Sequence, residues 1–433
     1  MRVRIDDVSF FDECDPSQTK TGHIIIRDER IEALLEGGSA EPAESFDEII
    51  DGSSKLVLPG LINAHGHAAM TLFRGYADDL PLYTWLTEKI WPAEDMLTQD
   101  DVYIGTQLAM LEMIETGTTT FTDMYVHMDR VAEAVIESGM RAVIGRGLVG
   151  LGEDRDEKLA EAIALIKDFH GAGNGRITTT LAPHAPYTCP EDFLKQIIDQ
   201  AASLDQSIQI HIAETTKEVA DLQKSKGMTP IRFLDGMGLF DQRVTAAHCT
   251  FLTDDDIDLM AHKDVRVAHN PGSNLKLGSG VAPLAKMLQA GLKVGLGTDG
   301  AASNNKLDLF EEMRLVALLH KGVLQDPTAV PAHKAFLLAT TGGADALFLN
   351  DVGTLTPGSL ADLILVDISS PRYYPRHSLL SHAVYSSQAG DVTDVFVAGR
   401  HLYKNREFLT IDKERVVAEA ERRSRKFYAA RRG

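Results

Sequence analysis

Two histidines one residue apart, His65 and His67, end an apolar run that begins at Leu58. Alternate residues of a β-strand share a face, so both imidazoles would leave the strand end on the same side. Gly66 between them adds no bulk. Two imidazoles that converge on one point suit a divalent metal ion such as zinc. A lone His-x-His pair also occurs in surface loops, so the rest of the chain must supply further ligands.

Three more polar residues stand where other apolar segments end, namely His211, His248 and Asp299. Taken singly, each histidine fits a capped strand end, and Asp299 before Gly300 fits a turn. A catalytic zinc ion needs about three protein ligands and an open position for water. An unmetallated histidine cluster is the alternative, but every buried imidazole would then need its own hydrogen-bond partner. We therefore predict one metal ion held by His65, His67, His211 and Asp299.

The same polar residues belong to a regular alternation of β-rich apolar segments and helical patterns. Helices are predicted at 101–116, 129–138, 156–169, 190–203 and 253–262, and Asp, Pro or Thr opens several of them. Eight strands are predicted, which end at or near His65/His67, Asp123, Arg146, His184, His211, His248, His269 and Asp299. Eight strand-helix units fit a closed (β/α)8 barrel, whose strand ends meet at one mouth. An open doubly wound sheet would usually carry a Gly-rich loop after its first strand, and this sequence has none there.

The two ends of the chain have a different character, with short strands and tight turns. Residues 22–31, 358–367 and 392–400 all show strand patterns. The N-terminal segment holds too little apolar material to fold alone, so we expect the two ends to share one small β domain. The predicted limits are 1–57 for its N-terminal part, 58–350 for the barrel, and 351–433 for its C-terminal part with a terminal helix.

Composition restricts the partners and the compartment. The 433 residues are 44% hydrophobic and 24% charged, with a net charge of −20, which argues against a nucleic-acid partner. The basic run at residues 422–426 is expected to form a solvated helix face. Three cysteines (Cys14, Cys189 and Cys249) form no paired motif, and no segment approaches the roughly 20 apolar residues of a membrane span. Since the N-terminus also lacks a signal-peptide core, we predict a cytoplasmic protein with no membrane partner.

Several motifs together resemble one known family. They are residues 59–67 (Pro-Gly-Leu-Ile-Asn-Ala-His-Gly-His), 211–214 (His-Ile-Ala-Glu), 247–248 (Ala-His), 269–271 (His-Asn-Pro) and 297–300 (Gly-Thr-Asp-Gly). The chain resembles the amidohydrolase superfamily nearly end to end, and most of all its 5-methylthioadenosine/S-adenosylhomocysteine deaminases. The resemblance implies a distorted (β/α)8 metal-dependent hydrolase barrel with a composite β-sandwich built from both termini. Some members bridge two metals with a modified lysine after strand four. Residues 181–187 contain no lysine, which favours one metal.

The catalytic roles follow from the metal and from the resemblance. A bound zinc ion lowers the pKa of its water to about 7. Asp299, beside both metal and water, is predicted to accept the water proton. Glu214, three residues after His211, is placed to move protons rather than to hold metal. The resemblance implies that Glu214 protonates the ring nitrogen next to the attacked carbon, and that His248 orients the hydroxide.

Substrate contacts rest mainly on the resemblance. Glu94 matches a glutamate that binds ribose hydroxyls, and a carboxylate is a good acceptor for two vicinal hydroxyls. His184 matches a residue that contacts substrate. Arg146 matches an arginine near the distal end of the substrate, where a guanidinium can hold an amino-acid carboxylate. A helix-start glutamate and an ordinary ion-paired arginine are the alternatives. Apolar walls are expected from Met70, Trp85 and Leu86.

The predicted function is metal-dependent deamination of the adenine ring of 5′-methylthioadenosine or S-adenosylhomocysteine, which are small purine nucleosides. A related enzyme acting on adenosine, guanine, another purine or pterin base, or a triazine would share the same ligands. A barrel that lost its chemistry is a different class, but it should lack a ligand or Glu214, and all are in place. Zinc is the expected metal, although iron or manganese suits the same ligands. Family habit implies a homo-oligomer.

Overall fold

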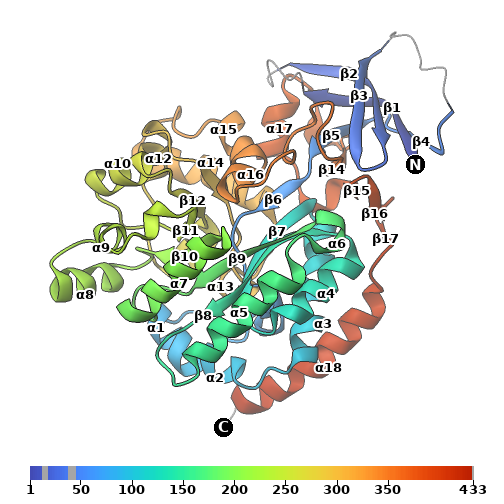
Figure 1. The fold of residues 1–433 in the computed structure, drawn as a ribbon. Coiled ribbons are helices and arrows are strands. Elements are labelled where there is room, and N and C mark those ends of the chain that lie inside the picture. Colours follow the sequence, from blue (N-terminus) through green and yellow to red (C-terminus); the bar gives the residue numbers. More distant parts are fainter. Residues whose placement is uncertain (12–17, 38–44, 432–433) are drawn as a thin grey trace.

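The structure, a computed structural model, describes residues 1–11, 18–37 and 45–431 (Figure 1). Within this part of the chain, eight parallel strands neighbour one another in chain order around a barrel. They are β6 (Leu61–Asn63), β7 (Thr118–Tyr125), β8 (Arg141–Leu148), β9 (Ile177–Pro183), β10 (Ser207–Ile212), β11 (Val244–His248), β12 (Arg266–His269) and β13 (Val294–Leu296). The Ala64 N–H donates to the Leu296 carbonyl (2.8 Å) and links the first strand to the last. The predicted barrel is confirmed.

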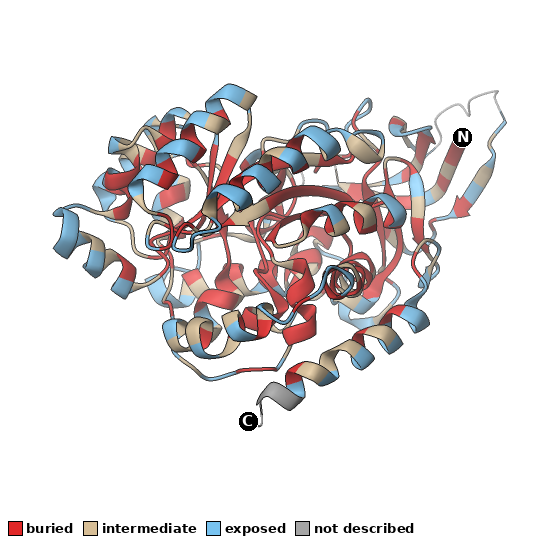
Figure 2. Ribbon diagram, turned by 60° about the horizontal axis from the view of Figure 1, so that its bottom comes forward, coloured by how far each residue is buried: buried red, intermediate tan, exposed pale blue. Residues whose placement is uncertain are grey.

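Helices cover the outside of the barrel, and Figure 2 shows the strands buried and the helices exposed on their outer sides. Five lie close to the predicted limits: α3 (Gln99–Glu115), α4 (Met128–Ser138), α5 (Arg155–Phe169), α7 (Glu191–Leu204) and α10 (Asp254–His262). The Thr98 hydroxyl accepts the Asp101 N–H, and the Asp101 carboxylate accepts the Thr98 N–H, so a reciprocal cap fixes the start of α3.

Further helices fill the loops and the second half of the barrel. Between β6 and α3 the chain forms η1 (Ala68–Phe73), α1 (Leu82–Thr84), the π-helical turn η2 (Trp85–Ile90) and α2 (Trp91–Glu94). After these come α6 (Ala172–Gly175), α8 (Thr216–Lys226), α9 (Pro230–Gly236), η3 (Leu239–Asp241), α11 (Pro271–Lys276), α12 (Leu284–Gln289), α13 (Ala301–Asn304), α14 (Leu309–Leu324), α15 (Ala332–Leu338) and α16 (Thr341–Ala346).

The two chain ends share one mixed sheet, as expected. Its strands are β1 (Arg2–Phe11), β2 (Thr19–Arg27), β3 (Arg30–Glu36), β4 (Glu48–Asp51), β5 (Lys55–Pro59), β14 (Leu363–Asp367), β15 (Val392–Val397), β16 (Arg400–Lys404) and β17 (Glu407–Phe408). β14 pairs antiparallel with β5, so the first and last parts of the chain lie side by side at the upper right of Figure 1. One face of the sheet packs on its own core, which includes Val57 and Leu363, and the other packs on the barrel core through Leu58 and Ile364. The exact domain limits stay a prediction.

The C-terminal region ends in α17 (Leu379–Tyr385), the short turns η4 (Pro371–Tyr373) and η5 (Ala389–Asp391), and the long helix α18 (Lys413–Arg431). α18 packs against α3. The expectation of a fully solvated basic face at 422–426 is wrong, because Arg423 and Lys426 both pair with the buried carboxylate of Asp101 (3.1 and 2.5 Å). The basic run therefore anchors the helix to the barrel.

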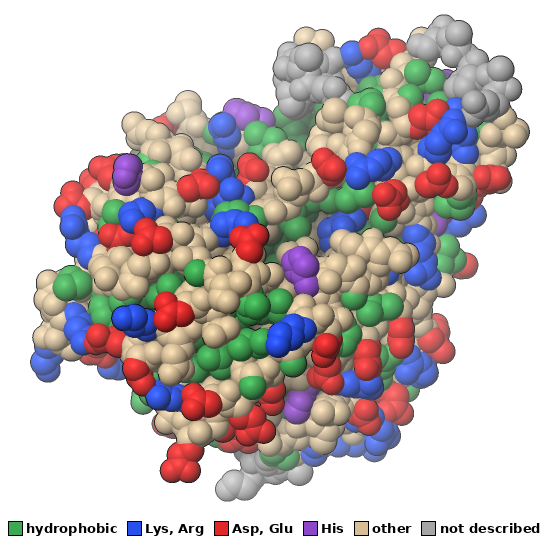
Figure 3. Space-filling view, viewed as in Figure 1, with side chains coloured by type: hydrophobic (Ala, Val, Ile, Leu, Met, Phe, Trp, Pro, Cys, Tyr) green, Lys and Arg blue, Asp and Glu red, His purple; other side chains and the backbone are tan. Residues whose placement is uncertain are grey.

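Surface and cysteine features complete the description. Acidic and basic side chains are interspersed over the face shown in Figure 3. Among the described residues, no helix has the length and apolar character needed to span a bilayer. Cys189 and Cys249 are buried and unpaired, whereas Cys14 lies outside the described residues.

Candidate active site

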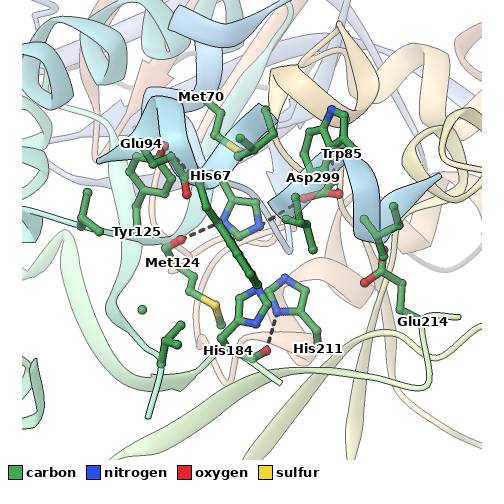
Figure 4. A pocket seen from close by; sticks show the side chains of 18 of the residues that line it. His67, Met70, Trp85, Glu94, Met124, Tyr125, His184, His211, Glu214 and Asp299 are labelled. Carbon is green, nitrogen blue, oxygen red and sulfur yellow. Dashed lines mark hydrogen bonds and ion pairs between the residues drawn. The ribbon is translucent and has the colours of Figure 1, made fainter. Parts of the chain in front are cut away.

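Side chains at the ends of the first, fifth, sixth and last strands of the barrel lie close together. Figure 4 shows three of them, His67, His211 and Asp299, pointing toward one another. Candidate ligand atoms of His65, His67 and His211 lie within 4.8 Å of one another, and so do those of His65, His248 and Asp299. Oδ1 of Asp299 is 3.2 Å from Nε2 of His67 and 3.6 Å from Nε2 of His65. The structure thus brings the four predicted metal ligands together, with His248 beside them.

The donor set fits a divalent cation. Nδ1 of His67 is 2.7 Å from the Met124 carbonyl, and Nδ1 of His211 is 2.6 Å from the His184 carbonyl. A carbonyl only accepts, so each Nδ1 carries the hydrogen and each Nε2 lone pair is left for a metal, the usual arrangement around metal-binding histidines. Both ring nitrogens of His65 are buried without a hydrogen-bond partner among the described residues. A buried imidazole without a partner is costly, and a bound cation would supply one.

Electrostatics tie the histidines to Asp299. Burial lowers the pKa of His65 to about 4, so this ring is neutral at pH 7. Burial also disfavours charge on His67, but the hydrogen bond and charge of Asp299 outweigh it and raise the pKa of His67 to about 9. Burial would raise the pKa of Asp299, yet His65 and His67 hold it well below its usual value. A metal ion must therefore displace a proton from His67 when it binds.

Residues of α11 and α13 form hydrogen bonds with the side chains of Asp299 and His248. Oδ2 of Asp299 accepts the hydroxyls of Ser273 (2.6 Å) and Ser303 (2.8 Å), which leaves Oδ1 toward the histidines. Nδ1 of His248 lies 2.8 Å from the amide oxygen of Asn274, so Nδ1 carries the hydrogen and Nε2 is free to accept. Sequence reasoning missed Ser273, Ser303 and Asn274. Ser273 and Asn274 lie in α11, just after the strand that ends at His269, but serine and asparagine are common where a loop leads into a helix.

A cavity of about 590 Å³ opens over this cluster. Glu94 and Glu214 both line it, and Figure 4 shows them on opposite sides of the group formed by His67, His211 and Asp299. Burial raises the pKa of Glu214, and it raises the pKa of Glu94 to about 7 although a hydrogen bond from the Tyr125 hydroxyl (2.7 Å) opposes this shift. Sequence reasoning missed Tyr125, which follows Asp123 in β7.

The other predicted substrate contacts also line the cavity, and so do the expected apolar walls Met70, Trp85 and Leu86. Nδ1 of His184 is 2.9 Å from the Thr188 hydroxyl, and burial lowers the pKa of His184 to about 3, so the ring is neutral. Arg146 donates from Nε to Glu161 (2.7 Å) and also bonds the Gly147 carbonyl.

Two strand-end residues do not join the cluster. Asp123 is buried, its carboxylate accepts the Ala68 N–H (3.1 Å), and it is not among the described residues that line the cavity. Nε2 of His269 faces Nε2 of His320 on α14 at 3.4 Å. The expectation that every polar strand end faces the mouth is wrong for these two residues.

A family model described as the amidohydrolase family matches residues 56–402. The chain belongs to the amidohydrolase family. It is 50% identical over 424 residues to a protein from Dictyoglomus thermophilum named 5-methylthioadenosine/S-adenosylhomocysteine deaminase, and the match covers 98% of each chain. The family and the branch expected from the sequence are thereby confirmed.

Solved amidohydrolase structures share the architecture. A zinc-bound adenosine deaminase from Xanthomonas campestris superposes with a TM-score of 0.93 at 35% identity, over 99% of this chain and 98% of that one. A zinc-bound atrazine chlorohydrolase from Arthrobacter aurescens has a TM-score of 0.88 at 25% identity, over 97% and 99% of the two chains. Amidohydrolases are metal-dependent, in agreement with the histidine-rich cluster of this chain.

Proposed function

We propose that this protein hydrolytically deaminates the adenine ring of 5′-methylthioadenosine and S-adenosylhomocysteine, giving the inosyl product and ammonia. The observation that carries the proposal is the placement of two carboxyl groups, the partly buried Glu94 and the buried Glu214, on opposite sides of one histidine-aspartate cluster inside a single cavity. Glu94 can accept hydrogen bonds from the sugar hydroxyls while Glu214 exchanges a proton with the ring. The names and full-length identity of the relatives support the substrate class.

One Zn²⁺ ion is proposed at His65, His67, His211 and Asp299. A divalent cation held there would supply an acidified water molecule near neutral pH. Asp299 would accept a proton from the attacking water, and the Ser273 and Ser303 hydroxyls, which donate to its Oδ2, would fix the plane of the carboxylate.

Glu214 moves the second proton. Because burial raises its pKa, its protonated form persists to higher pH than is usual for glutamate. We assign it to donate that proton to the ring nitrogen beside the carbon that bears the amine. His248, with its Nδ1 hydrogen on Asn274, presents Nε2 to the attacking water and orients it.

Glu94 is proposed to accept hydrogen bonds from the two ribose hydroxyls, and His184 is proposed to contact the bound nucleoside. Arg146, at the cavity wall, is assigned to the carboxylate of the homocysteine tail. We also propose a cytoplasmic location, since the few cysteines suit a reducing compartment, and a homo-oligomer by family habit.

A second candidate is hydrolysis of another ring, such as a free purine base or a triazine, because the zinc-bound atrazine chlorohydrolase shares the fold of this chain. Glu94 distinguishes the two candidates, since a free base or triazine has no ribose for it to bind. The test is ammonia release by zinc-replete protein from methylthioadenosine, S-adenosylhomocysteine, adenosine, adenine and guanine, with chloride release from atrazine measured in parallel. We expect turnover of the first two nucleosides. Turnover of bases or atrazine alone would favour the second candidate.

A further inference from the structure

The Glu218 side chain accepts hydrogen bonds from the backbone next to and at Glu214. It lies in the first turn of α8, and the whole residue is 7% exposed. Its two carboxylate oxygens accept the N–H groups of Ala213 (2.8 Å) and Glu214 (2.9 Å). We call these two hydrogen bonds the Glu218 clamp. Among the described residues, Glu214 lines the cavity and Glu218 does not.

The clamp departs from the local rule for helix starts. Thr215 and Glu218 have the spacing of a capping box, in which the acidic side chain returns to the N–H of the capping residue. The Thr98/Asp101 and Thr253/Asp256 pairs of this chain do form that box. At α8 the Thr215 hydroxyl accepts the Glu218 N–H (3.2 Å), but the carboxylate reaches past Thr215 to the two preceding residues. The helix cap alone does not explain this reach.

Ala213, one of the two residues held by the Glu218 clamp, has a strained backbone. It also connects two loops of the site. Ala213 has a φ of +52°, in the left-handed region that residues with a side chain rarely adopt. Its carbonyl accepts the N–H groups of Thr250 and Phe251 (3.0 Å each), which belong to the loop after β11. That loop begins at His248, itself left-handed with a φ of +70°. Ala213 thus connects the loop of Glu214 with the loop of His248, and Glu218 holds it in place.

We propose that Glu218 is a positioning residue that fixes the Glu214 carboxyl for proton transfer and, through Ala213, steadies the loop after His248. The inference rests on the proposed function, because it assigns Glu214 a proton to transfer. A strained backbone persists only where its surroundings over-determine it, and two backbone N–H groups that donate to one buried carboxyl group do so here. Small displacements of a proton donor lower the rate of the chemical step more than they weaken binding.

The test is the Glu218→Gln variant, whose single carbonyl oxygen can serve only one of the two N–H groups. We expect kcat for methylthioadenosine to fall on the order of 10- to 100-fold, with KM and zinc content unchanged. Thr215→Ala is the matched control, since it removes the helix cap of the same turn and leaves the clamp; we expect it to keep at least about half of kcat. If Glu218→Gln does not fold, Glu218→Asp, which is shorter by one methylene, should show the same loss of kcat.

A double-mutant cycle separates positioning from general damage. If the clamp acts through Glu214, adding Glu218→Gln to Glu214→Gln should lower kcat by less than about threefold, because the positioned group is already gone. Equal losses in both backgrounds, or full activity of Glu218→Gln or of Glu218→Asp, would overturn the inference. A wild-type protein that deaminates no nucleoside would instead contradict the proposed function, so the two failures are distinguishable.

Discussion

Nε2 of His67 lies 3.2 Å from Oδ1 of Asp299, although these residues follow the first and the last strand of the barrel. The backbones meet at the same place, since the Asp299 N–H donates to the His65 carbonyl (3.0 Å). The seam where the barrel closes is therefore also where the predicted metal ligands converge. Barrel closure and the predicted metal site therefore depend on the same pair of chain segments.

Metal binding should depend on Asp299 and on pH. We expect Asp299→Ala to weaken zinc binding more than about 100-fold, because loss of even an outer partner of a ligand costs about 10- to 100-fold. Since the pKa of metal-free His67 is about 9, zinc binding at pH 7 should release a proton, and affinity should fall as pH is lowered. Competition with a chelator at several pH values measures the zinc affinity, and the pH change in weak buffer measures the proton release. Asp95→Asn, which alters a cavity carboxylate away from the cluster, should leave zinc affinity unchanged.

Loss of the Glu214 proton should stop chemistry without removing the metal. Glu214→Gln keeps the size of the side chain but can no longer exchange a proton, so we expect ammonia release to fall about 100- to 10,000-fold with zinc content intact. Single-turnover rates and metal analysis of the same preparation test this. Normal turnover by this variant would show that another group transfers the proton.

If Glu94 binds the ribose, KM should depend on pH for nucleosides and not for free bases. Its folded pKa is about 7, so protonation below that pH removes acceptor capacity, and KM for methylthioadenosine should decrease as pH rises from 6 to 8. Glu94→Gln should abolish this slope and lower kcat/KM for nucleosides about 10- to 100-fold, with less effect on adenine. Tyr125→Phe removes a hydrogen bond that lowers the Glu94 pKa, so the profile should move to higher pH. Equal losses on adenine and on nucleosides would refute the ribose contact.

Arg146 should separate the two proposed substrates. Its guanidinium is assigned to a carboxylate that S-adenosylhomocysteine has and methylthioadenosine lacks. We expect Arg146→Met to lower kcat/KM for S-adenosylhomocysteine about 10-fold or more and to change the value for methylthioadenosine little. Steady-state kinetics with both substrates measure these values. Equal losses of kcat/KM for the two substrates would show that Arg146 has a structural role through its ion pair with Glu161.

The anchor of α18 should contribute to acid stability. Burial works to raise the pKa of Asp101, but Lys426, Thr98 and Arg423 outweigh it and lower the pKa to about 2. The stabilisation is therefore present above pH 4 and is lost as pH falls toward 2. We expect Asp101→Asn to reduce the free energy of unfolding at pH 7 by roughly 2 kcal/mol and to flatten its pH dependence between 4 and 2. Asp100 is the matched control, because its side chain is 66% exposed and only long ion pairs reach it, from Arg130 (3.5 Å) and Arg423 (3.7 Å). Asp100→Asn should therefore change the free energy of unfolding much less in denaturant titrations.

The sequence predicted the barrel well because its strands are short apolar or threonine-rich runs that end in polar residues. Asp299 and His67 could be paired in advance, since the first and last strands of a barrel must meet. Asp123 shows the limit, because Arg146 occupies the equivalent position in the next strand and lines the cavity whereas Asp123 does not, so distance from the strand end alone does not decide which residues face the mouth. Tyr125, Ser273, Asn274 and Glu218 were missed, since their roles depend on contacts between loops and leave no periodic pattern. The π-helical turn at Trp85–Ile90 was missed for the same reason.

The pairing of β14 with β5 runs from Leu363 opposite Pro59 to Asp367 opposite Lys55. A ribosome must therefore complete nearly the whole polypeptide before β5 gains this neighbour. Until then, the apolar edge of β5 is exposed on the nascent chain. Exposed strand edges bind chaperones or pair with the edges of other chains. Messages truncated before codon 363 should accordingly yield aggregates instead of a smaller working enzyme.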